Sequence, residues 1–196
     1  MPELLEAVGR TDFAAFQWLR THHWLLADLV MAGFSDIARG GGIWMGLAIL
    51  IALLHRGRWP GAVQVVLAVL LTGQLTDHVA KPFFNRARPF ESYADTQVYG
   101  FKPTTRSFPS GHAAQAMAGA YALTRLAPDA RAIFWVLGFL IAFSRIYLGV
   151  HYPSDVIVGG LFGLAVARFV VGGTIWRSTQ TAVNTLSGMQ RHSKSS

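Results

Sequence analysis

The chain has 196 residues, of which 52% are hydrophobic and 14% carry a charge. Soluble domains are about one quarter charged, so this composition favours a membrane protein over a soluble protein with an unusually large core. The net charge of +7 comes from basic residues scattered between apolar runs, which argues against a nucleic-acid-binding surface and fits an anionic ligand. Cysteine is absent, which excludes thiolate chemistry and zinc–thiolate sites.

The N-terminal region, residues 1–39, is predicted to be an amphipathic segment. Between Phe13 and Phe34, apolar side chains recur near helical spacing but are interrupted by charged residues and histidines. This pattern favours a helix that lies in the membrane interface, and the alternative is a sixth membrane-crossing helix. The first ten residues include Glu3, Glu6 and Arg10 with no basic stretch before an apolar run, so no signal peptide is expected.

Five weakly charged, apolar stretches follow along the chain. Most are shorter than the ~18 uncharged residues that identify a membrane-crossing helix unaided. Short connections between them, and polar residues gathered at one set of their ends, nevertheless favour a membrane bundle over the buried helices of a soluble protein. We therefore predict an all-α, polytopic helix bundle with five transmembrane helices, or six if the N-terminal region also crosses. The stretches are residues 40–54, 59–76, 110–124, 132–144 and 154–171.

The bundle is expected to form one transmembrane domain over residues 40–177, followed by a polar C-terminal tail over residues 178–196. Gly159 and Gly163 lie four residues apart in the last stretch, which predicts close packing of that helix against a neighbour. No chemistry is assigned to these glycines.

Basic residues at the helix ends opposite the polar cluster predict the orientation of the bundle. These ends carry Arg56, Arg58, Arg125 and Arg131, and further basic residues follow in the tail. Since cytoplasmic loops are enriched in Lys and Arg, this end is expected to face the cytoplasm. Five basic residues between the second and third stretches argue the other way, but a long loop that builds a site is weak evidence for topology. The predicted location is the bacterial plasma (inner) membrane, with the site on the extracytoplasmic side.

Three polar segments lie at the ends expected to face outward, and together they hold every candidate site residue. They are Lys81-Pro-Phe-Phe-Asn-Arg-Ala-Arg88-Pro89, Ser107-Phe-Pro-Ser110-Gly111-His112, and Ser144-Arg145-Ile-Tyr-Leu-Gly-Val-His151-Tyr-Pro-Ser-Asp155. The second segment predicts the start of a helix, with Ser110 as its N-cap. The backbone N–H groups of Gly111 and His112 would then point outward without partners, which suits an anion. Three cations are expected at the same end and suit phosphate oxygens: Lys81, Arg88 and Arg145.

Two histidines and an aspartate would lie near the bound anion. One histidine can attack phosphorus and the other can protonate the leaving oxygen, while Asp155 can hold the attacking imidazole in one tautomer. Taken singly, a cation at a helix end often snorkels to the interface, and His151 and Asp155 could be metal ligands with His112 as a third. The surrounding positive charge would repel a metal cation. The groups together therefore favour a phosphoryl-transfer site that needs no metal and no cofactor.

These segments resemble the three-part pattern of the type 2 phosphatidic acid phosphatase superfamily, in its integral membrane branch. The pattern is a lysine and Arg-Pro separated by six residues, then Pro-Ser-Gly-His, then Ser-Arg, five residues, His, three residues and Asp. The sequence matches every fixed position, and with the flanking helices the resemblance covers most of residues 40–173. It implies His151 as the nucleophile that forms a phosphohistidine, Asp155 as its orienting partner and His112 as the proton donor. It also implies that the phosphoryl oxygens are bound by Lys81, Arg88, Ser110, Gly111 and Arg145.

The function expected from this resemblance is a metal-independent lipid phosphate phosphatase. Candidate substrates are phosphatidic acid, phosphatidylglycerol phosphate, undecaprenyl diphosphate and the phosphate of lipid A, and the sequence does not separate them. A lipid phosphotransferase and a non-catalytic phospholipid-binding or transport protein are the alternatives. The expected partners are the lipid substrate and membrane lipids, not nucleic acid, and the oligomeric state is left open.

Two further features of the site region are left open. Lys102 and Arg106 precede the second segment and are either contacts for a second anionic group or solvated loop charges. Asp77 lies four residues before Lys81, so the two could pair on a helix and compete with phosphate for Lys81.

Overall fold

The computed structural model of the protein describes residues 2–93, 96 and 98–172. Every regular element in this part of the chain is helical, which confirms the all-α prediction. The predicted tail over residues 178–196 lies outside the described residues, and the division into three regions stays a prediction.

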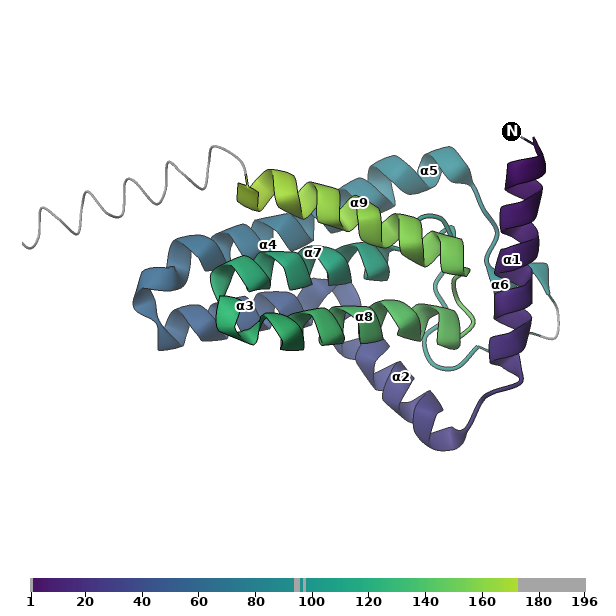
Figure 1. Cartoon of the computed structure of the whole chain (residues 1–196), viewed down its shortest axis with the longest axis horizontal. Helices are drawn as coiled ribbons and strands as arrows, with labels where there is room; N and C mark the ends of the chain where they lie inside the picture. The colour runs from purple at the N-terminus through teal and green to yellow at the C-terminus, as the bar shows by residue number, and fades with distance from the viewer. Residues whose placement is uncertain (1, 94–95, 97, 173–196) are drawn as a thin grey trace, which may run out of the picture.

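Five helices run side by side and form the body of the molecule (Figure 1). They are α3 (Gly42–Leu54), α4 (Trp59–Gln74), α7 (Gly111–Leu126), α8 (Arg131–Tyr147) and α9 (Pro153–Gly172). Helix α7 lies at the centre and packs against the other four. It presents small side chains to them, since Ala113, Ala116, Ala118 and Ala120 are all fully buried.

Helix α9 approaches α7 very closely, as the two glycines predicted. A Cβ atom added at Gly163 would lie 2.0 Å from the carbonyl oxygen of Ala114, and one added at Gly159 would lie 2.5 Å from that of Ser110. Only glycine leaves room for these contacts between backbones. The packing of α9 therefore brings the first turn of α9 beside the first turn of α7, where two of the three polar segments meet.

The described helices support a multi-pass membrane protein. Three helical runs are long and apolar enough to cross a membrane: Arg56–Ser92, Pro128–Tyr147 and Pro153–Gly172. A fourth crossing is possible if α2 (Leu25–Ile37) and the run Arg39–Leu54, which meet at a bend of 49°, form one span. Helix α7 has 16 residues, so the predicted count of five or six transmembrane helices is not confirmed.

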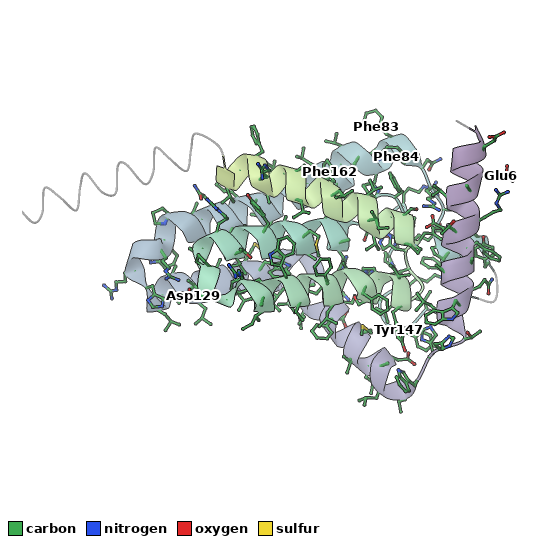
Figure 2. All side chains as sticks on the ribbon, viewed as in Figure 1. Glu6, Phe83, Phe84, Asp129, Tyr147 and Phe162 are labelled. Carbon is green, nitrogen blue, oxygen red and sulfur yellow. The ribbon has the colours of Figure 1, made fainter. Side chains whose placement is uncertain are left out.

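Apolar side chains cover the outside of the bundle, as a lipid-facing surface requires. Ile133, Phe139, Leu161 and Phe169 are each more than 60% exposed. Figure 2 shows Phe83 projecting from the short helix α5 (Lys81–Phe84), where Phe83 is 80% and Phe84 is 58% exposed.

The single N-terminal helix predicted between Phe13 and Phe34 is wrong, because the chain forms two helices there. Helix α1 (Pro2–Arg20) ends before Thr21, and α2 begins at Leu25. At the break, the Thr21 hydroxyl and the Nδ1 atom of His22 each lie 2.7 Å from the carbonyl oxygen of Trp18, a group that a continuing helix would use. Figure 1 shows α1 lying across one end of the bundle. Whether it lies in a membrane interface stays a prediction.

The two ends of the bundle differ as expected. Figure 1 shows the short connections α3–α4 and α7–α8 at one end, with the C-terminus of α9. The other end carries α1, α5, α6 (Pro89–Ser92) and the connection between α8 and α9. The three polar segments thus gather at one end of the bundle, opposite the basic connections. The membrane side that each end faces stays a prediction.

Candidate active site

The turn between α8 and α9 positions His151 against Asp155. Pro153 begins α9, and the Asp155 carboxylate in its first turn accepts the backbone N–H of Tyr152 at 3.0 Å. Oδ2 of Asp155 lies 3.4 Å from Nδ1 of His151 and accepts the Ser107 hydroxyl at 2.5 Å. The first of these distances is longer than an ideal hydrogen bond, which is common in catalytic sites without substrate. The arrangement favours a proton on Nδ1 and leaves Nε2 with a lone pair.

The His151 imidazole is buried, with 2% of its surface exposed. Burial lowers its pKa to about 3, and the neighbouring Arg88 and Arg145 guanidinium groups add to this effect against the opposing influence of Asp155. At neutral pH the imidazole is therefore neutral, which is the state that a nucleophile requires.

Arg88 contacts the Nε2 nitrogen of His151, and its other donors are hydrogen-bonded to protein groups. Its Nη1 atom lies 3.1 Å from Nε2 of His151 and donates to the carbonyl oxygen of Val150 at 2.8 Å. Its Nε atom donates to the Thr105 carbonyl at 2.6 Å, and Nη2 donates to the Thr105 hydroxyl and the Arg106 carbonyl. All five N–H groups of the guanidinium thus have protein partners. Arg88 ties the loop before the second segment to the His151 turn.

Lys81 forms an ion pair with Asp77, as their separation of four residues allowed. A π-helical stretch, Leu75–Ala80, joins α4 to α5 and precedes Lys81. The Lys81 Nζ atom donates to Oδ1 of Asp77 at 2.6 Å and to the Thr105 hydroxyl at 3.0 Å. One of its three N–H groups is left for an anion.

Helix α7 begins with the predicted N-cap. The Ser110 hydroxyl accepts the backbone N–H of Ala113 at 3.4 Å, and the Ser110 N–H donates to the backbone carbonyl of Asp155 at 3.0 Å. The side chain of Ser110 is fully buried in this role. The first N–H groups of a helix have no partner within it, so Gly111 and His112 present theirs at the helix end.

Of the three predicted phosphate-binding cations, Arg145 has the most open donors. It lies in the last turn of α8, is 2% exposed, and donates Nη1 to the Ser35 hydroxyl on α2. Its Nε and Nη2 atoms are buried and have no hydrogen-bond partner among the described residues. A buried cation with two unsatisfied donors is costly, so an anion at this place would be strongly favoured.

These groups surround one cavity of about 390 Å³. Its wall includes six of the eight residues predicted for the site: Lys81, Arg88, Gly111, His112, Arg145 and His151. Ser110 and Asp155 lie behind the wall, as N-cap and as partner of His151. Arg39, Asp77 and Gln115 also line the cavity, whereas Lys102 and Arg106 do not. Lys102 instead lies over the ring of Phe90, with Nζ 4.6 Å from its centre.

The sequence did not predict three residues that contact Asp155 or its partners. Ser107 donates to Asp155, Arg86 forms an ion pair with Asp155, and Asp12 forms one with Arg86. Ser107 and Arg86 lie inside the quoted segments, where only their position hinted at a role, and Asp12 carries no sequence signal.

No group of three or more His, Asp or Glu side chains within residues 2–93, 96 and 98–172 is arranged to hold a metal ion. His112 therefore does not complete a metal site with His151 and Asp155. Independence from metal stays a prediction.

A helical bundle with three polar segments around a cationic cavity at one end fits a membrane protein that binds an anionic group. The model of the PAP2 superfamily matches residues 61–178, and the chain belongs to this superfamily. An undecaprenyl-diphosphatase of Sulfolobus acidocaldarius is 34% identical over 125 residues, which are 62% of this chain and 58% of that protein. A lipid A 4'-phosphatase of Bacteroides thetaiotaomicron is 31% identical over 83% of this chain and 75% of that protein.

Two solved structures share the fold. The crystal structure of LpxE from Aquifex aeolicus superposes with a TM-score of 0.68 at 29% identity, over 82% of this chain and 94% of that one. The PAP2-type phosphatidylglycerolphosphate phosphatase of Bacillus subtilis has a TM-score of 0.68 at 27% identity, over 85% of both chains. Another relative, a lipid A 4'-phosphatase of Porphyromonas gingivalis, is matched over 65% of its length. The chain thus spans about three fifths of the first curated relatives and most of the two solved structures.

Proposed function

We propose that this protein is a membrane phosphatase that hydrolyses the phosphate monoester or diphosphate of a lipid through a phosphohistidine on His151. The main support for the proposal is the placement of His151. His151 lies in the wall of the cationic cavity and its Nδ1 atom faces Asp155, which leaves Nε2 as the nitrogen that can react with a substrate. A neutral imidazole held in this tautomer can attack a phosphorus atom in the cavity once the Arg88 N–H that faces Nε2 has turned away.

In the first step, Nε2 of His151 forms a bond to phosphorus as the bond from phosphorus to the lipid oxygen breaks. The proton on His112 moves to the departing oxygen, which leaves as an alcohol or a phosphate. The negative charge of the bound substrate favours the protonated form of His112 before this transfer. Arg145, Lys81 and the N–H groups at the start of α7 stabilise the charge on the three phosphoryl oxygens.

In the second step, water attacks the phosphohistidine and the P–N bond breaks. The now neutral His112 takes a proton from the water, so inorganic phosphate leaves and both histidines return to their starting states. Asp155 stabilises the imidazolium character of His151 in both steps. No step needs a metal ion, because the charge on the phosphoryl group is met by protein cations and backbone dipoles.

The substrate class rests on the relatives and on the membrane setting. The relatives named above act on undecaprenyl diphosphate, lipid A and phosphatidylglycerol phosphate by their names. The cavity lies at one end of an apolar bundle, where the headgroup of a membrane lipid is presented. We place this end on the extracytoplasmic side of a bacterial inner membrane, since the opposite end carries the basic connections.

The test is phosphate release by the purified full-length protein from a panel of lipid phosphates and diphosphates. We expect turnover of at least one lipid in the presence of a chelator and less than about 1% of it in His151→Ala, since loss of a nucleophile typically costs more than ~10³-fold. His55→Ala is the matched control, because His55 is an exposed histidine at the opposite end of the bundle. Release that survives the loss of His151 would refute the nucleophile.

The same panel separates the alternatives. Labelled phosphoryl groups that appear on a second lipid instead of in solution would indicate a phosphotransferase. Lipid binding without turnover of any lipid would indicate a binding or transport protein.

A further inference from the structure

Helix α1 carries one buried carboxylate, that of Asp12. Its surface is 3% exposed, whereas Glu3 and Glu6 on the same helix are exposed. Asp12 accepts the backbone N–H of Ser154 at 2.9 Å and the Ser154 hydroxyl at 2.5 Å. It therefore binds the first turn of α9, one residue before Asp155.

Arg86 connects this carboxylate to the active site. Its Nη2 atom donates to Oδ2 of Asp12 at 2.7 Å, and Nη1 donates to Oδ1 of Asp155 at 2.7 Å. Nη1 also donates to the Ser154 hydroxyl at 2.8 Å, and the guanidinium carbon lies 4.1 Å from the centre of the Tyr152 ring. A planar guanidinium can bridge two carboxylates in this way because its donors point in fixed directions.

The contact with Arg86 determines how the Asp155 carboxylate is turned. Oδ1 is occupied by Arg86, so Oδ2 is the oxygen that receives Ser107, the backbone N–H of Tyr152 and Nδ1 of His151. The rotation of the carboxylate, and with it the orientation of the imidazole, thus depends on where Arg86 is held. Asp12 holds Arg86 through Nη2, the terminal nitrogen that does not contact Asp155.

We infer that Asp12 is a positioning residue of the active site, which acts through Arg86 and Asp155 on His151. Helix α1 then completes the site, although it lies outside residues 61–178 that match the PAP2 superfamily. This inference rests on the proposed phosphatase function. It also gives α1 a role that an interfacial amphipathic helix alone would not have.

Aromatic packing holds α1 in place independently of Asp12. Phe16 is 1% exposed, and its ring centre lies 5.9 Å from that of Tyr93 and 6.3 Å from that of Tyr152. Phe13 contacts Tyr93 at 4.9 Å. A variant that loses only the charge of Asp12 is therefore expected to keep α1 docked.

The experiment compares Asp12→Asn with Glu6→Gln in the full-length protein, with a lipid phosphate that the wild type hydrolyses. Asn keeps an acceptor for Ser154 but loses the charge that holds Arg86. We expect kcat of Asp12→Asn to fall about 10- to 100-fold, as for other residues that orient a catalytic group. The inhibition constant of inorganic phosphate should stay within about twofold of wild type, because the cavity wall does not include Asp12. Glu6→Gln alters an exposed pair with Arg10 and should match wild type.

A second variant tests the same path from the other side. Lys at position 86 keeps the charge but has one ammonium group in place of a fork, so Arg86→Lys should also lower kcat and spare phosphate inhibition. If the two residues act along one path, the double variant should be no worse than about twofold below Arg86→Lys alone. Asp12→Asn with wild-type kcat, or losses that multiply in the double variant, would overturn the inference. So would a fall in kcat that is matched by an equal loss of phosphate inhibition in both single variants.

The dependence of turnover on His151 and on Asp12 distinguishes a failure of the phosphatase proposal from a failure of the positioning role. A wild type whose turnover does not depend on His151 refutes the proposed function whatever Asp12 does. A wild type whose turnover depends on His151 but not on Asp12 refutes only the positioning role.

Discussion

Substitution of Gly159 by alanine tests whether the contact between α7 and α9 positions the active site. An added Cβ would lie 2.5 Å from the carbonyl oxygen of Ser110 and 3.0 Å from its nitrogen. Ordinary contacts of this kind begin near 3.4 Å, so the first turns of the two helices must separate by about 0.9 Å. The obstacle is backbone, which cannot turn aside as a flexible side chain would.

The separation acts directly on the catalytic groups. Ser110 starts the helix that carries His112, and its N–H donates to the carbonyl of Asp155, which orients His151. A displacement of about 1 Å between reacting groups costs about 100-fold in rate, so we expect a similar fall in kcat for Gly159→Ala. The overpacked contact should also destabilise the protein by about 1–3 kcal/mol.

Gly46→Ala is the matched control, because Gly46 lies within α3 and an added Cβ would meet nothing within 4 Å. Alanine is the better helix former, so this variant should be as stable as wild type or more so. Initial rates with a lipid phosphate in detergent, together with thermal unfolding of both variants, measure the two effects. A Gly159→Ala enzyme with kcat within about twofold of Gly46→Ala would show that the close contact does not position the site.

Three further predictions concern charge and orientation. Asp77→Asn should lower the inhibition constant of inorganic phosphate by about two- to fivefold, because Lys81 is released from a partly exposed ion pair. Such pairs contribute about 0.2–1 kcal/mol. Unchanged inhibition would mean that Lys81 does not contact the anion. The pKa of His151 is lowered by burial to about 3, so unfolding takes up a proton below an ordinary histidine pKa near 6.5 and stability falls as the pH decreases. From pH 7 to pH 5 this loss is about 2 kcal/mol and should be absent in His151→Gln, as thermal unfolding of both proteins at the two pH values would reveal. A membrane-impermeant maleimide should label Arg106→Cys in intact cells but Asp129→Cys, at the opposite end of the bundle (Figure 2), only after permeabilisation, and the reverse pattern would invert the topology.

Several helix positions in the bundle were predictable from the apolar runs, although the second run, residues 59–76, continues as a helix to Phe84. The predicted stretch 154–171 corresponds to α9 at Pro153–Gly172, and 132–144 lies within α8 at Arg131–Tyr147. The N-terminal region was predicted less well. Its periodicity continues through His22, and only the structure shows that α1 ends at Arg20, where Thr21 and His22 both contact the Trp18 carbonyl.

The residues around the cavity were predictable because fixed spacings place them at helix ends that a bundle brings together. Spacing alone could not predict which cations have free donors. Asp12 and Arg86 are 74 residues apart in the chain, and Arg86 and Asp155 are 69 apart. Neither pair follows a helical or turn period, so only the docking of α1 against the end of the bundle brings these three groups together.

The three predicted phosphate-binding cations differ in how many of their present hydrogen bonds must break before they can bind an anion. Arg145 has at least three open N–H groups, one on Nε and two on Nη2, so it can bind phosphate oxygens without breaking a contact. Lys81 has one, and Arg88 has none. In the proposed mechanism, the N–H of Arg88 that faces Nε2 of His151 must turn away before attack, because a lone pair that accepts a hydrogen bond cannot at the same time bond to phosphorus. A phosphoryl oxygen beside Nε2 offers that N–H a charged acceptor in place of a neutral one. Substrate binding would therefore uncover the nucleophile at the moment when phosphorus is in place.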